Sequence, residues 1–418
     1  MKDQVKRTQV MYILEAGLEY LISILVAGAY LAKMTAAIGL SDGVTGILSS
    51  VISLGHLFQL GSILIRPRRA KGFVVALSVV NQLLFMSLYL IPGVSLSRGV
   101  KTALFVVLIL SAYVIYNLAH PKKINWLMSM VDDSIRGRFT SIKEMISLIM
   151  GIVFTMAMGA VIDHFEAKGQ METAFIICAV TIFVITVLHT LTMLFSAEKP
   201  QDLHSGKKTN AVFAVLKDKN ILKIAMIFAL YYASSACATP FYGTYQTKEL
   251  GFTMFFISLL GFLGSGVRIA FSFFWGNFAD KRGFSVMLRC CMAVLASAYL
   301  VNAFTAPANG KVMFTIYSCL SAIAMAGCNS ALINLVYDYV DVNRRADAIA
   351  VTQAVSGVVG FSVTLAVSPL VALIQKSNSF LGIPMYAQQV VSFMSFAFSC
   401  ITILYITVAF GKRAKKDA

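Results

Sequence analysis

Residues 173–196 read TAFIICAVTIFVITVLHTLTMLFS, a run that contains no Asp, Glu, Lys or Arg. A helix needs about 20 mostly apolar residues to cross the ~30 Å hydrocarbon core of a bilayer. The stretch from Glu172 to Ser196 therefore predicts one membrane-spanning helix.

Eleven more apolar runs, each bounded by polar residues, Gly or Pro, divide the rest of the 418-residue chain. The first run is too long for the apolar region of a signal peptide and has no small-residue cleavage site, so we expect it to be retained. The twelve predicted spans are 11–33, 44–65, 72–92, 102–129, 139–163, 172–196, 221–247, 251–278, 284–304, 312–339, 347–375 and 387–411.

The composition supports this reading of the whole chain. Hydrophobic residues make up 58% of the chain and charged residues 13%, and the mean hydropathy is +0.78. Soluble domains average about 45–50% apolar residues and about 25% charged residues. A water-soluble chain of this composition could not cover its own core, which excludes a soluble enzyme. The seven Cys all fall in apolar runs without ligand-like spacing, so we expect neither a disulfide framework nor a metal or other cofactor. The fold class predicted is an all-α membrane protein.

The net charge of +16 follows the loops and does not form a single basic face. With the N-terminus inside, 27 of the 35 Lys and Arg lie on the inner side, seven lie outside and Arg268 lies within a span. Such an asymmetry is typical of cytoplasmic loops. It predicts that both termini are cytoplasmic and that the number of spans is even, and it argues against nucleic acid as a partner.

Two parts of the chain repeat each other at an offset of 209 residues. Residues 117–162 and 326–371 share nine identical positions without gaps, Gly55 matches Gly264, and Gln59 falls opposite Arg268. We therefore expect two parallel six-helix halves, 1–196 and 221–418, joined by a polar linker at 197–220, with the substrate path between them. The identical pairs are Ile124/Ile333, Asn125/Asn334, Val131/Val340, Asp132/Asp341, Arg136/Arg345, Ser147/Ser356, Gly151/Gly360, Thr155/Thr364 and Ala157/Ala366.

Three short loops carry recognisable motifs. The loop after span 8 reads GNFADKRG at 276–283, and the loops after spans 4 and 10 read VDDSIRGR at 131–138 and VDVNRRAD at 340–347. With the twelve-span frame, these motifs resemble the major facilitator superfamily over the whole chain. The resemblance implies alternating access by two six-helix bundles, a central cavity lined by spans 1, 4, 7 and 10, and loop contacts that latch the cytoplasmic face in one state.

The residues assigned to these loops by the motifs are Gly276, Asp280, Lys281, Gly283, Asp132, Arg136, Asp341 and Arg345. Glycines permit a tight turn at a helix end, and we expect Gly276 and Gly283 to form one. Asp280 is expected to meet the positive N-terminus of span 11, with capping of its own turn as the alternative.

The chain also departs from the superfamily's patterns. Ile65 stands where the first-half copy of the loop motif would carry Asp, and span 5 lacks the Gly-Pro pair of drug/proton antiporters. Span 4 lacks their Arg, and the loop after span 6 lacks the sugar-porter signature. The resemblance therefore implies a superfamily and no particular substrate.

Ionisable residues inside spans are expensive and are functional candidates. Glu15 and Glu19, four residues apart in span 1, share one helical face. They could bind and release a proton together, because two buried carboxylates resist both being charged, or they could pair with a cation on another helix. Glu15 lies close to the cytoplasmic end of the span, so a solvated or lipid-interface role is a further alternative for it. Arg268 needs an anion, for which Glu19, Asp338 or an anionic substrate group would serve.

Other polar side chains fall inside the predicted spans and are candidates for substrate contact. Hydrogen bonding between helices is the alternative for each of them, and Pro240 is expected to break span 7. The candidates are His56, Gln59, Asn117, His120, Tyr231, Tyr232, Asn329 and Asn334.

These features predict a secondary active transporter of a small organic solute, with protons as the candidate coupling ion. The alternatives are a uniporter or exporter without proton coupling, and a non-transporting receptor on the same fold. No catalytic motif or Walker-type phosphate loop is present, so we expect neither an enzyme nor an ATP-driven pump. We expect a functional monomer surrounded by lipid in a prokaryotic cytoplasmic membrane.

Overall fold

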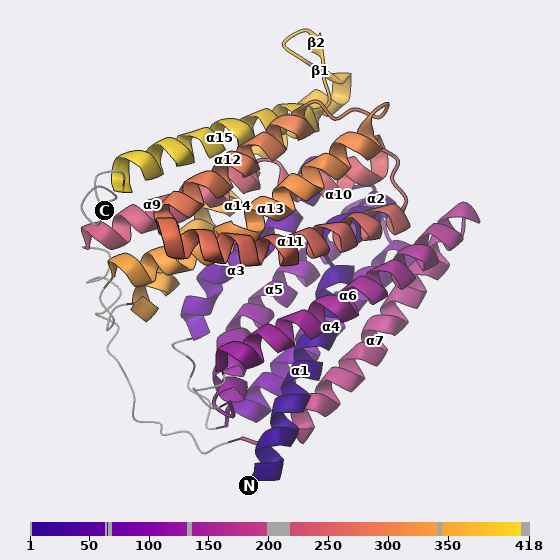
Figure 1. Ribbon diagram of the computed structural model, residues 1–418. Helices are drawn as coiled ribbons and strands as arrows, with labels where there is room; N and C mark the ends of the chain where they lie inside the picture. The colour runs from indigo at the N-terminus through magenta and orange to yellow at the C-terminus, as the bar shows by residue number, and fades with distance from the viewer. Residues whose placement is uncertain are drawn as a thin grey trace. The chain divides into compact units, whose positions relative to one another are not determined.

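The computed structural model describes residues 2–62, 65, 69–131, 136–198, 218–340 and 345–410. Almost all of these residues are helical (Figure 1). The first half contains α1 (Lys2–Leu25), α2 (Gly28–Ala37), α3 (Asp42–Ser62), α4 (Ala70–Leu90), η1 (Ile91–Gly93), α5 (Arg98–Met128), α6 (Arg136–Ala167) and α7 (Met171–Phe195).

The second half has its long helices in the same order, with different short elements between them. It contains α9 (Lys219–Ala236), η3 (Thr239–Phe241), α10 (Tyr242–Thr244), η4 (Tyr245–Glu249), α11 (Met254–Arg282), α12 (Phe284–Ala303), α13 (Gly310–Tyr339), α14 (Arg345–Ser377) and α15 (Ala387–Phe410). A two-stranded hairpin, β1 (Ser379–Phe380) and β2 (Ile383–Pro384), separates α14 from α15. It projects beyond the ends of these two helices (Figure 1).

Eleven helices among the described residues are long and apolar enough to cross a membrane, and each falls on a predicted span. Helix α3 covers the remaining predicted span, with a shorter apolar stretch at Asp42–Gly55. Large apolar side chains such as Val107, Val153 and Leu404 are more than half exposed on these helices. Lipid tails would cover such side chains at no cost. The all-α membrane fold is confirmed.

Two predicted spans are shorter as helices than expected. Span 11–33 was expected to be continuous, but α1 ends at Leu25 and α2 begins at Gly28, whose φ of +53° cannot continue a right-handed helix. In the second half, α9 ends at Ala236 and Pro240 lies in η3. The predicted break at Pro240 is confirmed, since proline cannot donate the helical hydrogen bond.

The same pattern of helix packing occurs in both halves. In the first half, α1 packs on α6 and α7, while α4 packs on α5 and α7. In the second half, α9 packs on α14 and α15, while α12 packs on α13 and α15. Each helix therefore has its counterpart in the order predicted by the 209-residue repeat.

The structure also sets the register between the first helices of the two halves. Gly151 on α6 faces Tyr20 and Ile24 of α1, whereas its repeat partner Gly360 on α14 faces Tyr232 and Ala236 of α9. Tyr20 thus corresponds to Tyr232, an offset of 212 residues. The offset between α1 and α9 is therefore three residues larger than the 209-residue offset between α6 and α14.

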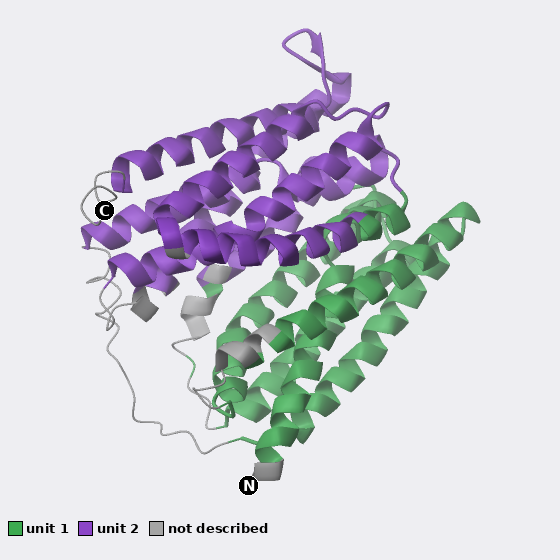
Figure 2. Ribbon diagram, viewed as in Figure 1, with its two compact units in different colours: residues 1–41, 58–205, 253–259 green, residues 42–57, 206–252, 260–418 purple. Residues whose placement is uncertain are grey.

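The chain divides into two compact units that differ from the predicted halves at two places (Figure 2). Unit 1 comprises residues 1–41, 58–205 and 253–259, and unit 2 comprises residues 42–57, 206–252 and 260–418. The exchanged segments are the beginnings of α3 and α11. These two segments correspond to each other at the 209-residue offset. The first half contributes the beginning of α3 to unit 2, and the second half contributes the beginning of α11 to unit 1.

Polar contacts hold each exchanged segment in its unit. In unit 2, Asp42 at the start of α3 pairs with Lys248 and accepts a hydrogen bond from Nε2 of Gln375 (2.7 Å). In unit 1, the carboxylate of Asp163 on α6 accepts the backbone N–H groups of Met254 (2.7 Å) and Phe255 (2.8 Å). A carboxylate at a helix N-terminus satisfies donors that have no partner within the helix.

Replacing Gly151 with Leu tests the contact of α1 with α6. A side chain at this position would collide with the ring of Tyr20, and such overpacking typically costs about 1–3 kcal/mol. We expect a lower thermal unfolding temperature for the purified protein. Gly261→Leu is the control, because a Cβ there meets no atom within 4 Å; equal losses in both variants would contradict the packing argument.

Candidate functional site

Three helices of unit 1 bring a charged cluster together in the interior. Glu15 and Glu19 lie one turn apart on α1, as their spacing predicted, and Lys123 reaches them from α5. Nζ of Lys123 lies 2.7 Å from Oε1 of Glu15 and also forms an ion pair with Glu19. The Lys123 and Glu15 side chains are only 6% and 2% exposed. The ammonium therefore bridges two carboxylates away from water.

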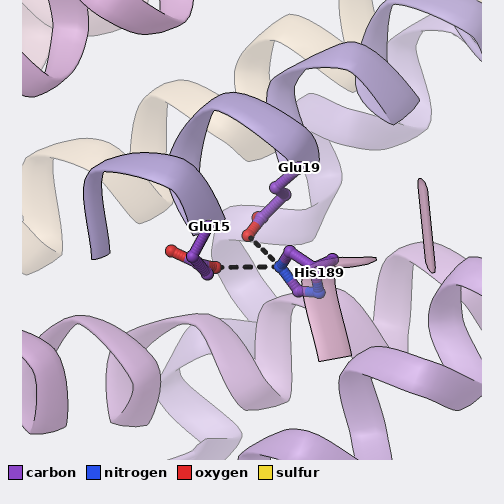
Figure 3. A group of neighbouring side chains, drawn as sticks. All are labelled: Glu15, Glu19 and His189. Carbon is purple, nitrogen blue, oxygen red and sulfur yellow. Dashed lines mark hydrogen bonds and ion pairs between the residues drawn. The ribbon is translucent and has the colours of Figure 1, made fainter. Parts of the chain in front are cut away.

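His189 on α7 completes the cluster (Figure 3). Its Nε2 lies 3.0 Å from Oε1 of Glu15 and 3.7 Å from Oε2 of Glu19. On the other side of the ring, Nδ1 lies 3.0 Å from Nε2 of Gln82 on α4. An amide nitrogen can only donate, so Nδ1 accepts this hydrogen bond and Nε2–H donates to Glu15. This arrangement describes a neutral imidazole.

The cluster carries an uneven charge in this arrangement. Two carboxylates face one ammonium and one neutral imidazole, which leaves one negative charge without a partner. A buried charge is costly unless it is paired. One bound proton, or one bound cation, would make the cluster neutral.

A small polar pocket opens beside the cluster within unit 1. Hydrogen-bonding side chains from α1, α4 and α5 form most of its wall, and the rings of Tyr116 and His120 lie against each other with centroids 4.9 Å apart. In this arrangement the space inside is about that of one water molecule, so a larger solute could enter only if the surrounding helices move. The lining residues are Glu19, Ser78, Asn81, Gln82, Tyr116, Ala119, His120 and Lys123.

The fold does not require this cluster, because unit 2 repeats the fold without it. In the register set by Tyr20 and Tyr232, Glu15 corresponds to Ile227 of α9. In the gap-free repeat of α5 and α13, Lys123 corresponds to Leu332. Both apolar residues are buried, at 0% and 3% exposed. Since apolar side chains fill the same places equally well, the charged pair in unit 1 points to function.

Several other predicted candidates also lie in unit 1. His120 lies near the cluster, with its Nδ1 3.9 Å from Oε1 of Glu19. Asn117 is buried and donates from Nδ2 to the backbone oxygen of Tyr113 (2.8 Å). This contact lies within its own helix, α5. The side chains of His56 and Gln59 lie outside the described residues.

Unit 2 holds the remaining candidates inside the membrane. The Tyr231 hydroxyl lies 2.9 Å from Sδ of Met325, and the rings of Tyr231 and Tyr232 meet edge to face. Asn334 donates to the backbone oxygen of Ser330 (2.9 Å), and Asn329 is exposed. These positions form no charged cluster among the described residues.

Arg268 was expected to pair with an acidic side chain. In the structure it is exposed and forms no ion pair with any residue that the structure describes, while Glu19 is taken by Lys123. No ion pair with Asp338 is therefore seen within unit 2, while the expected pairing with Glu19, which lies in unit 1, stays a prediction. The remaining alternative, an anionic group of the solute as the partner of Arg268, also stays a prediction.

The motif loop at 276–283 is mostly helical. Gly276 lies within α11, which continues to Arg282, and Lys281 is exposed in its last turn. Only Gly283 takes a positive φ, of +79°. The tight turn expected from two glycines is therefore made by Gly283 alone. The side chain of Asp280 lies outside the described residues.

The paired acidic and basic loops cannot be compared with the structure. Asp132 and Asp341 lie outside the described residues, as does most of the predicted linker 197–220. Arg136 and Arg345 begin α6 and α14, but their side chains are not described.

Sequence reasoning missed three members of the cluster. Lys123 had been assigned to a basic cytoplasmic loop, yet it is buried inside α5. His189 and Gln82 were single polar residues in apolar runs and were not singled out. Lys123 lies six residues before the predicted end of span 4 at residue 129. This was the one available signal, because lysines that set the topology belong to loops.

The donor set of Glu15, Glu19 and His189 also resembles a metal site. The three ligand atoms lie within 4.8 Å of one another. Lys123, however, contacts both carboxylates, so a divalent ion would have to displace a buried ammonium. We therefore derive no metal chemistry from the cluster.

The comparisons with known proteins agree with the fold and the motifs. A model of the Major Facilitator Superfamily matches residues 13–365. The chain belongs to the major facilitator superfamily. No curated protein sequence is similar enough to match this superfamily member. Its loop motifs and its duplicated helix order are those of the superfamily.

Solved structures share the fold at low sequence identity. The nucleoside transporter NupG is 16% identical with a TM-score of 0.69, covering 97% of this chain and 99% of that chain. A bacterial homologue of the iron transporter ferroportin is 14% identical (TM-score 0.71; 97% and 98% covered). The D-xylose-proton symporter is 13% identical (TM-score 0.66; 97% and 97% covered). At these identities the similarity shows the fold.

Replacing Glu15 and Lys123 by the residues found at the corresponding positions of unit 2 tests the role of this buried pair. Lys123→Leu alone leaves two buried carboxylates without a cation and should cost about 3–5 kcal/mol of stability. The double variant Glu15→Ile with Lys123→Leu should recover part of this loss, because both replacements are the residues found in unit 2. The thermal unfolding temperatures of the purified variants measure the effect. A double variant less stable than Lys123→Leu would show that the pair is needed for folding.

Proposed function

We propose that this member of the superfamily is a secondary active transporter of a small polar solute, coupled to protons through the Glu15–Glu19–Lys123–His189 cluster. The carrying observation is that unit 1 contains a buried, charge-unbalanced cluster, whereas unit 2 has buried Ile227 and Leu332 at the positions of Glu15 and Lys123. Intramembrane ionisable groups without a structural need are typical of proton pathways.

The position of the cluster supports its link to a solute. The resemblance implied that spans 1 and 4, here α1 and α5, line the central cavity, and the cluster joins these two helices. Glu19 and Lys123 belong to both the cluster and the pocket wall. A solute in the pocket would therefore lie directly beside the proton-binding groups.

The charge balance provides a physical mechanism for coupling. Without a bound proton, the cluster is negative and Lys123 is held by both carboxylates. With one bound proton, the cluster is neutral and the hold on Lys123 weakens, which frees hydrogen-bonding capacity toward the pocket. Alternating access then follows if the neutral, loaded state and the empty state favour different arrangements of the two halves.

The class of solute follows from the pocket and from the relatives of similar fold. Besides Glu19 and Lys123, which pair with each other, the pocket wall offers uncharged polar groups and an aromatic face from Tyr116 and His120. Relatives of similar fold include a nucleoside transporter and a D-xylose-proton symporter. We propose a neutral polar organic solute, such as a nucleoside or a pentose, as the first class to be tested.

The orientation and surroundings complete the proposal. The excess of Lys and Arg in one set of loops supports cytoplasmic termini, and the proposal takes the chain to work as a monomer in a prokaryotic cytoplasmic membrane. The alternatives are a uniporter or exporter without coupling and a receptor that does not transport. They differ from the proposal in whether solute flux moves protons or occurs at all.

The test combines a binding screen with a flux measurement. Thermal stabilisation of the purified protein by nucleosides, pentoses, amino acids, carboxylates and amphiphilic cations identifies the solute, since ligands that bind the folded state raise its stability. Proteoliposomes containing a pH-sensitive dye then receive a gradient of that solute. We expect wild-type protein to change the internal pH, and Glu15→Gln or Glu19→Gln to abolish the change.

The matched control is Glu166→Gln. It removes a carboxylate of unit 1 that pairs with Lys33 away from the cluster. It should keep the coupled pH change. Solute flux without any pH change in wild-type protein would favour a uniporter, binding without flux would favour a receptor, and a pH change that persists in both cluster variants would end the coupling role.

A further inference from the structure

Only one of the two polar atoms of the Gln82 amide has a hydrogen-bond partner in the described part of the chain. Its Nε2 donates to Nδ1 of His189 at 3.0 Å, while its Oε1 is buried and has no hydrogen-bond partner among the described residues. Gln82 is only 2% exposed and lines the pocket. An unsatisfied buried acceptor destabilises the arrangement that contains it. The present arrangement therefore leaves this oxygen available for another state.

The ring of His189 limits what that other state can be. The ring is fully buried, with Nε2–H committed to Glu15 and Nδ1 accepting from Gln82. If His189 gains a proton, Nδ1 becomes a donor and can no longer accept from an amide nitrogen. Rotating the Gln82 amide by half a turn would present Oε1 to Nδ1–H. The same side chain can thus satisfy either protonation state.

We propose that His189 is the group that binds the coupling proton, and that Gln82 is the positioning residue whose amide reverses to accept the new N–H. This inference rests on the proposed function only in taking the bound proton to be the coupling proton. The proton enters at Nδ1, no covalent bond between heavy atoms changes, and the cluster passes from one net negative charge to none.

Charged groups from several helices surround the ring and act on its charge in both directions. From α1, Glu15 and Glu19 face Nε2 at 3.0 and 3.7 Å. From α5, Lys123 contacts the same carboxylates and opposes the added charge. From α6, Lys143 lies over the ring of Tyr12 on α1 (5.1 Å) and is a more distant cation. From α4, the neutral Gln82 is the one contact at Nδ1 that the structure shows.

The alternative is that a carboxylate takes the proton. A proton on Glu15 or Glu19 would leave His189 neutral, and the oxygen of Gln82 would stay without a partner in both states. A proton on His189 gives that oxygen an N–H donor and converts the contact with Glu15 into an ion pair. The reversed amide leaves its own N–H groups where the oxygen stood, so the gain that favours the ring is the ion pair with Glu15.

Solid-state nitrogen NMR of the full-length, ¹⁵N-histidine-labelled protein in lipid bilayers tests the proposal. The His189 signals are assigned by their absence in His189→Asn. Between about pH 8 and pH 5, the range in which histidine normally titrates, we expect Nδ1 of His189 to change from unprotonated to protonated. In Gln82→Leu the same nitrogen should stay unprotonated over that range, because its new N–H would have no acceptor.

Two variants keep the result decisive. Gln388→Leu removes another buried glutamine, on α15 in unit 2, and should titrate like wild-type protein. Gln82→Glu offers a permanent acceptor and should hold His189 protonated at both ends of the range, even if Gln82→Leu fails to fold. The proposal is overturned if Nδ1 never gains a proton in wild-type protein, or if it titrates identically in the Gln82 variants. Coupled flux with a neutral His189 would overturn this inference alone and leave the proposed function standing.

Discussion

Hydrocarbon offers no hydrogen bonds and no counter-ions, and this constraint shapes every level of the protein. Backbone groups must be satisfied within each segment, which leaves helices as the available element. Where a helix breaks, as at Gly28 or Pro240, the break occurs at the same place in both halves and is followed by short helical turns. Charged side chains must find partners among themselves, which is why Lys123 contacts two carboxylates.

The duplication gives the protein an internal comparison. Two units built from the same helices with the same packing partners should have the same structural needs. A difference between them at equivalent buried positions therefore cannot be attributed to the fold. Ile227 and Leu332 show what packing alone requires, whereas Glu15 and Lys123 show what unit 1 carries in addition.

The sequence predicted the features that depend on local pattern. Hydropathy and length located the twelve spans, and the repeat predicted the correspondence of helices. The spacing of Glu15 and Glu19 predicted their common face. The partners of these carboxylates were not predictable in the same way. His189 is one polar residue in an otherwise apolar run, and its role depends on how α7 packs against α1 and α4, which no local pattern encodes. Lys123 was misassigned because a lysine near the end of a span resembles a topological signal.

The exchanged beginnings of α3 and α11 bear on how the chain can be divided. The halves predicted from the repeat describe how the sequence was duplicated, while the compact units describe what packs together. A fragment that stopped before the linker would keep residues 42–57 but lose Lys248 and Gln375, the groups that Asp42 contacts. If the two halves were produced as separate fragments, each would contain a segment whose packing partners lie on the other fragment. A split protein would therefore reassemble only if both fragments fold in each other's presence.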